Sequence, residues 1–215
     1  MFPVLLNLKG KSVVVFGGGK VAERRVAKLL KANAKIRVVS KEFTHSLKRL
    51  ADRNRGLELI TLTLDAANAR EFIRGSDFVL IATNDKDLNN TIEKESKAGG
   101  KLVNRADGLA DFSIPATLEL GDAIISISTS GKSPAVTKAI KRRIKKAITK
   151  EDILQVELQE FARKRLKKSI KDQAKRKEVL REALNSPEIL RLLKKGAVDR
   201  AKKELEETCD AYNKH

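Results

Sequence analysis

The sequence predicts an α/β fold: a doubly wound parallel sheet at the N-terminus, a β extension around 113–130, and a helical C-terminal part. A β-branched strand that runs into a glycine turn, and the strand–helix alternation after it, predict the sheet. Strand patterns stop at Ser133, which predicts the helical part. A chain of 215 residues with 41% hydrophobic content is long enough to bury a core. We therefore expect three segments, with the bounds 1–112, 113–150 and 151–215.

The first unit is a valine-rich strand at 12–16, followed by the turn Gly17-Gly18-Gly19-Lys20-Val21-Ala22 and by a helix. The helix is expected to end near Asn33, because asparagine tolerates the left-handed conformation. Its apolar residues recur at helical spacing and mark one face of the helix. These residues are Val21, Val26, Leu29 and Leu30.

Strand and helix patterns then alternate as far as the middle of the chain. Apolar runs predict strands at 35–39, 57–63, 77–82 and 101–104. Helices are expected between them: one capped by Thr44 and ending near 55–56, one at 65–74, and one capped by Asp85 or Asp87 and closed by Gly99-Gly100.

The pattern changes after Asp107. Two strand-like runs at 116–120 and 123–128 flank Gly121-Asp122, a dipeptide that is typical of a hairpin turn. Helical patterns follow, and we expect a basic helix starting at Pro134 and further helices at 151–184 and 187–208.

The glycine turn has the pattern G-x-G-x-x-A, in which glycines permit a tight turn and a close approach of backbone amides to a pyrophosphate. The phosphates would lie at the N-terminus of the helix, which favours negative charge. A purely structural turn is the alternative, but the preceding strand and the amphipathic helix favour dinucleotide binding and a Rossmann-type domain.

In an open parallel sheet, ligands bind at the carboxyl ends of the strands. Four loops are expected to face one cleft there: Gly17 to Val21, Ser40-Lys41-Glu42, Thr83-Asn84-Asp85 and Asn104 to Asp107. The second strand offers no acid for the ribose until Glu42, whereas Ser40 could bind a hydroxyl and Lys41 an added phosphate. The spacing therefore leaves NAD and NADP open, and Lys41 could also belong to an ordinary turn.

Asp107 is the candidate for acid–base or metal-binding chemistry, because it follows the carboxyl end of a strand. In an apolar cleft the pKa of its carboxyl would rise toward the range that proton abstraction needs. The alternative is a turn or cap aspartate ahead of Gly108.

Composition excludes several classes of protein. The single Cys209 excludes an internal disulfide or a cysteine-rich metal site, and two histidines, His45 and His215, are too few for a histidine metal cluster or a Ser-His-Asp triad. No apolar stretch suits a membrane span or a signal peptide, so we expect a cytoplasmic protein.

The net charge of +18 is concentrated in residues 132–215, which hold 25 Lys and Arg against 13 Asp and Glu. Such a surface attracts polyanions, although a thermophile's charged helices would have the same composition. Nucleic-acid binding is disfavoured, since aromatic residues for stacking are few.

Ordered motifs extend the pattern beyond the glycine turn and cover most of residues 1–150. They are Phe2 to Lys11, Val15 to Arg24, Ala82 to Asp85, Val103 to Asp107, Phe112 to Ala116 and Ser128 to Pro134. With these motifs the chain resembles the precorrin-2 dehydrogenase family, which includes the N-terminal module of sirohaem synthase. The helical remainder is similar to the family in character rather than in motif.

The resemblance implies NAD-dependent oxidation of precorrin-2 to sirohydrochlorin, a step in sirohaem biosynthesis. It implies that Asp107 is the catalytic residue, in dehydrogenation and in metal insertion where a relative performs it. It places Lys20, Val21, Lys41 and Glu42 at cofactor contacts. Together with the glycine turn and the strand-end loops, the residues predicted to bind the cofactor are Gly17, Gly18, Gly19, Lys20, Val21, Ser40, Lys41, Glu42, Thr83 and Asn84. The resemblance places the tetrapyrrole at Asn104, Ser128, Thr129 and Lys132. It also implies a homodimer formed through the region after Pro134 and the helical end.

Physical chemistry agrees with an anionic substrate, because precorrin-2 carries acetates and propionates that lysine and arginine would match. The sequence holds no preformed metal site, and metal chelation as a second activity stays open. A non-enzymatic NAD-sensing module is the alternative function, and it would not need an aspartate at position 107.

Overall fold

The structure is a computed structural model that describes residues 2–108 and 111–213. The chain folds as two compact units, residues 1–114 and residues 115–215, each with its own apolar core. Among the described residues, no helix has both the length and the apolar character needed to cross a membrane.

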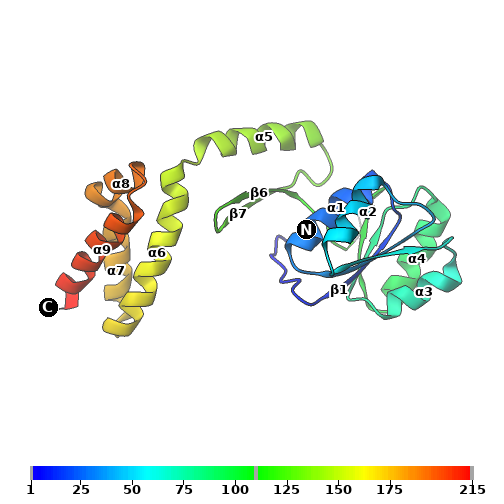
Figure 1. Cartoon of the computed structure of the whole chain (residues 1–215), viewed down its shortest axis with the longest axis horizontal. Helices are drawn as coiled ribbons and strands as arrows, with labels where there is room; N and C mark the ends of the chain where they lie inside the picture. Colours follow the sequence, from blue (N-terminus) through cyan, green and yellow to red (C-terminus); the bar gives the residue numbers. More distant parts are fainter. Residues whose placement is uncertain (1, 109–110, 214–215) are drawn as a thin grey trace. The chain divides into compact units, whose positions relative to one another are not determined.

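The first unit is a five-stranded parallel sheet in the order β3-β2-β1-β4-β5, with helices on both faces (Figure 1). The strands are β1 (Ser12–Phe16), β2 (Lys35–Ser40), β3 (Leu57–Thr61), β4 (Phe78–Ile81) and β5 (Leu102–Arg105). The helices are α1 (Lys20–Lys31), α2 (His45–Arg53), α3 (Ala66–Arg74) and α4 (Lys86–Ala98). The predicted doubly wound sheet, a Rossmann-like fold, is confirmed.

Alternation along β1 produces the two apolar layers of this unit. Val13 and Val15 pack with the buried faces of α1 and α2, whereas Val14 and Phe16 pack with α3 and α4. A strand buried on both faces needs apolar residues at successive positions, and this explains the continuous valine run. Because β1 is the central strand and is covered on both faces, the turn that follows it starts from a fixed point at the middle of the carboxyl ends of the strands.

Capping side chains begin two of these helices, and a left-handed residue follows the end of a third, much as predicted. The Thr44 hydroxyl accepts the Leu47 N–H at the start of α2, and Asp85 rather than Asp87 caps α4. Asn33 has φ of 56°, as its position at the end of α1 predicts. The strand predicted to reach residue 63 ends at Thr61, so residues 62–64 belong to a loop.

The second unit begins with the antiparallel hairpin of β6 (Ala116–Leu120) and β7 (Ala123–Ile127), turned at Gly121-Asp122 as predicted. The basic helix α5 (Pro134–Ala147) follows and buries none of its residues within this unit. Four further helices pack around one apolar core: α6 (Lys150–Ser169), α7 (Gln173–Asn185), α8 (Pro187–Lys194) and α9 (Val198–Asn213). The single cysteine, Cys209, is fully buried in that core.

Two predicted helices are each divided in the structure. The helix predicted over 151–184 stops at Ser169, and Asp172 caps a new one by accepting the Ala174 N–H at 2.7 Å. The helix predicted over 187–208 is interrupted at Gly196, whose φ of 71° is left-handed and ends α8. The breaks allow successive helices to fold back onto one core, which a single long helix could not do.

Replacement of Leu166 by alanine is expected to destabilise the helical unit by about 2–5 kcal/mol, because this fully buried side chain would leave a cavity in the core. Leu184→Ala is the matched control, since that leucine is 45% exposed and should cost less than about 1 kcal/mol. Urea unfolding followed by circular dichroism measures both changes. Equal losses for the two variants would contradict the burial of Leu166 in this core.

Candidate functional site

A cleft of about 270 Å³ lies at the carboxyl ends of the parallel strands. Loops after β1, β2, β3 and β4 line it, at the point where the strand order changes direction between β1 and β4. This is where doubly wound sheets bind ligands. Seven of the ten residues predicted to bind the cofactor line the cleft: Gly17, Gly18, Gly19, Ser40, Lys41, Thr83 and Asn84.

The protein itself accounts for two of the three glycines. Gly17 has φ of 106°, and a Cβ there would lie 2.4 Å from the Ala82 carbonyl oxygen. At Gly18 a Cβ would lie 2.0 Å from the Glu42 carbonyl oxygen. Both positions therefore need glycine for the turn to form.

Gly19 is different, because its φ of −83° suits any residue and a Cβ there would meet nothing within 4 Å. No protein contact explains this glycine. Gly19 is also the N-cap of α1, where free N–H groups and the helix dipole favour an anion. The open volume at a helix N-terminus fits the phosphates of a dinucleotide.

The remaining predicted cofactor residues lie around the turn rather than in the cleft. Lys20 lines a neighbouring cavity of about 450 Å³ between the starts of α1 and α2. Val21 and Glu42 are exposed and line neither cavity. Thr63 and Leu64 do line the cleft, and sequence reasoning missed them because it extended β3 through residue 63 and named no loop after that strand.

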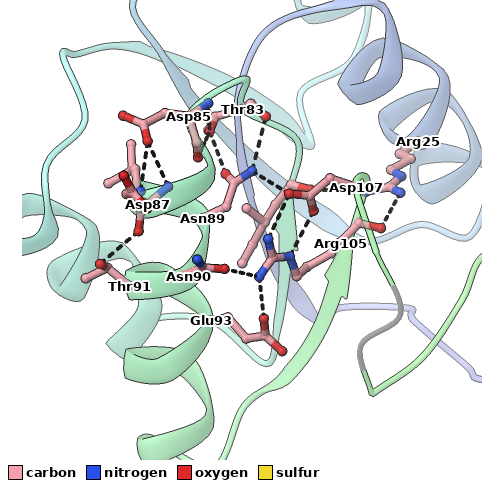
Figure 2. A network of polar contacts seen from close by, with 12 residues as sticks. Arg25, Thr83, Asp85, Asp87, Asn89, Asn90, Thr91, Glu93, Arg105 and Asp107 are labelled. Carbon is pink, nitrogen blue, oxygen red and sulfur yellow. Dashed lines mark hydrogen bonds and ion pairs between the residues drawn. The ribbon is translucent and has the colours of Figure 1, made fainter.

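Asp107 follows the end of β5, and Arg105 holds its carboxylate through two hydrogen bonds (Figure 2). The Arg105 Nε–Oδ1 distance is 2.9 Å, and the Nη2–Oδ2 distance is 2.7 Å. Arg105 also donates to Glu93 at 2.6 Å and to the side chain of Asn90 at 2.8 Å. Its guanidinium is thus fixed between two carboxylates, and its side chain is only 13% exposed.

The expectation of a raised pKa at Asp107 is wrong. The Arg105 hydrogen bonds hold the pKa of the Asp107 carboxyl well below its usual range, although desolvation opposes them. A further hydrogen bond from Asn89 acts in the same direction as Arg105. Asp107 is therefore an anion at every working pH and a weak base while this ion pair persists.

A second arginine supports the same edge of the sheet. Arg25, in α1, donates to the carbonyl oxygens of Ile81 and Arg105, the last residues of β4 and β5. Its burial lowers its pKa, with repulsion from Arg24 adding to the effect and attraction to Asp107 opposing it. The loops that carry Thr83 and Asp107 therefore start from fixed strand ends.

Replacing Arg105 by leucine is expected to raise the pKa of Asp107 toward about 4. The variant should be less stable than the wild type by about 1–3 kcal/mol at pH 7. A carboxyl whose pKa is depressed in the folded protein contributes stability only at a pH where it is ionised, so this difference between the two proteins should shrink as the pH falls below about 4. Carboxyl NMR titration and urea unfolding at two pH values measure these effects. An unchanged Asp107 titration would contradict the ion pair.

The residues predicted to contact the tetrapyrrole divide between the two units. Asn104 is buried in β5, and its amide donates to the Phe112 carbonyl oxygen at 2.7 Å. Ser128, Thr129 and Lys132 belong to the second unit, in the loop between β7 and α5. The Thr129 hydroxyl lies 3.0 Å from that of Thr137, so it is already engaged with the start of α5.

Metal-ligating side chains are dispersed in the part of the chain that the structure describes. Within residues 2–108 and 111–213, no group of three or more His, Cys, Asp or Glu side chains could hold a metal ion.

Comparison with known proteins places the chain in a family. Residues 4–116, just over half of the chain, match a family model described as putative NAD(P)-binding. Over 186 residues the chain is 37% identical to a precorrin-2 dehydrogenase of Methanosarcina barkeri, covering 86% of this chain and 83% of that protein. The chain belongs to the precorrin-2 dehydrogenase family.

Other members of the precorrin-2 dehydrogenase family extend the likeness over both units. A putative precorrin-2 dehydrogenase of Methanocaldococcus jannaschii is 34% identical, covering 91% of this chain and 95% of that protein. The solved structure of SirC, a precorrin-2 dehydrogenase, matches with a TM-score of 0.78 and 26% identity over 96% of this chain and 100% of that one. The chain is also 28% identical to a siroheme synthase of Mannheimia succiniciproducens, of which it spans 42%.

Proposed function

We propose that this protein oxidises precorrin-2 to sirohydrochlorin with NAD⁺. The single observation that carries the proposal is the open space at Gly19, at the N-terminus of α1. This space lies at the carboxyl ends of the parallel strands, where β5 leads to Asp107. The chain belongs to a family whose relatives are named precorrin-2 dehydrogenases, and this membership indicates precorrin-2 as the substrate. The reaction removes a hydride and a proton from the macrocycle.

Bound NAD⁺ would accept the hydride at its nicotinamide ring. The backbone N–H groups at the start of α1 would hold the pyrophosphate beside Gly19. Ser40 and Lys41, at the end of β2, are suited to the adenosine ribose, and Thr83 and Asn84 line the side of the cleft formed after β4. Lys20, Val21 and Glu42 remain proposed contacts at the rim of the turn.

Asp107 would act mainly through its negative charge. Its depressed pKa makes it a poor proton acceptor, but a fixed carboxylate stabilises the positive charge that develops as hydride leaves the macrocycle. The proton then passes to water rather than remaining on an Asp107 oxygen. Arg105 maintains the carboxylate in its ionised form throughout.

The tetrapyrrole contacts at Asn104, Ser128, Thr129 and Lys132 are part of the proposal, together with a homodimer and a cytoplasmic location. The strongly basic helix α5 supports an anionic substrate, since it carries Lys138, Lys141, Arg142 and Arg143. Its lack of buried residues supports a second copy of the chain as its packing partner.

The test is to incubate the purified protein with precorrin-2 and either NAD⁺ or NADP⁺, and to follow reduced nicotinamide and sirohydrochlorin by absorbance. We expect stoichiometric formation of both products with NAD⁺. Nucleotide binding without turnover would reject dehydrogenation and support a sensing module. A repeat with Fe²⁺ or Co²⁺ tests metal insertion, and size-exclusion chromatography with light scattering tests the dimer.

A further inference from the structure

Asn89 is a buried polar side chain to which the proposed reaction assigns no role. It lies in the first turns of α4 and is 1% exposed. Its amide nitrogen donates to the Thr83 carbonyl oxygen and to Asp107 Oδ2, both at 3.2 Å, and its amide oxygen accepts the Thr83 hydroxyl at 2.5 Å. Figure 2 shows this amide between the two loops.

The hydrogen bonds fix which way the Asn89 amide points. The Thr83 carbonyl oxygen and the Asp107 carboxylate can only accept hydrogen bonds, so the amide oxygen of Asn89 is left for the Thr83 hydroxyl, which donates to it at 2.5 Å and also lies 3.3 Å from the Asp85 carbonyl oxygen. The amide NH₂ then faces two acceptors, a carbonyl and a carboxylate. Only a side chain with one acceptor and two donors satisfies all three partners, and asparagine is the residue of this length that has them.

The partners of Asn89 are far apart in sequence and belong to the two halves of the proposed site. Thr83 lines the cofactor cleft, and Asp107 is the proposed catalytic carboxylate. Ser96, a buried polar residue on the same helix, instead uses its hydroxyl on its own helix, at the Ile92 carbonyl oxygen. A role confined to stabilising α4 would not require the contact of Asn89 with Asp107, which lies 18 residues away in the sequence.

We propose that Asn89 is the positioning residue that aligns the Asp107 carboxylate with the cofactor cleft. One amide sets the distance between the loop after β4 and the loop after β5, so the carboxylate is preorganised beside the reacting carbon. This inference rests on the proposed function. A loss of alignment of this kind typically costs about 10- to 100-fold in rate.

The test is a double-mutant cycle between Asn89→Ala and Asp107→Asn, measured as kcat with saturating NAD⁺ and precorrin-2. If Asn89 acts through Asp107, Asn89→Ala lowers kcat about 10- to 100-fold with a smaller change in KM, and has little further effect in the Asp107→Asn background. Thr91→Ala, which removes an intrahelical hydrogen bond on the same helix, is the matched control and should retain activity.

Losses that multiply in the double variant, or a wild-type kcat in folded Asn89→Ala, would overturn the proposal. Circular dichroism checks the fold, and Asn89→Ser provides a smaller change if the alanine variant does not fold. If the wild-type protein does not oxidise precorrin-2, carboxyl NMR still tests the contact. Asn89→Ala should raise the Asp107 titration midpoint, and an unchanged midpoint would reject the role of Asn89 independently of the reaction.

Discussion

Replacing Asp107 by alanine is expected to lower kcat/KM for precorrin-2 by at least about 100-fold, because the developing positive charge would lose its fixed counter-charge. Asp107 is not among the residues that line the cofactor cleft, so the affinity for NAD⁺ should change by less than about threefold. Initial rates and isothermal titration calorimetry measure the two effects separately.

Two further variants sharpen this prediction. Asp107→Asn keeps the size of the side chain and removes its charge, so a loss close to that of alanine would show that charge is what matters. Asp87→Asn is the matched control, since Asp87 is an exposed carboxylate on the neighbouring helix α4. Retained activity in both Asp107 variants would exclude the carboxylate from the reaction.

Gly19→Ala is expected to weaken NAD⁺ binding by about 10-fold or more, because its methyl group would occupy the space that the phosphates need. The fold should tolerate the change, since the backbone angles suit alanine and glycine-to-alanine at an N-cap costs only about 0.5 kcal/mol. Calorimetric binding and urea unfolding test the two halves of this prediction.

The neighbouring position provides the contrast. Gly18→Ala would bring a Cβ against the Glu42 carbonyl oxygen, so it should destabilise the whole first unit, by about 2 kcal/mol or more. Selective loss of binding at Gly19 and of stability at Gly18 would separate the two roles. Unchanged NAD⁺ affinity in Gly19→Ala would contradict the phosphate cradle.

Sequence periodicity was sufficient for the sheet and for most of the cofactor cleft. A valine run covered on both faces, a glycine turn and regular strand spacing each have a local pattern, and together they place Gly17 and Thr83 at one edge. Thr63 lines the cleft but was predicted to lie in the strand, because threonine is β-branched and favours strands. Only the pairing of β2 with β3 shows that the strand ends at Thr61.

The electrostatics of the site depended on contacts that have no local pattern. Arg105 precedes Asp107 by two residues, and in a strand two side chains at this spacing point to the same face. The spacing does not show that the guanidinium binds both carboxylate oxygens. Asn89 resembles any helical asparagine until tertiary structure brings it to Asp107. The helix breaks do have local signals, an N-cap aspartate at Asp172 and a glycine at Gly196. These signals were overlooked because the charged helical pattern continues on both sides of each break.

The burial of Cys209 has a practical consequence for spectroscopy. Its thiol is shielded inside the helical core, so a maleimide dye should react with an engineered surface cysteine while leaving the native one unmodified. A reporter attached near the rim of the cofactor cleft would then follow nucleotide association in real time, without first removing the native cysteine.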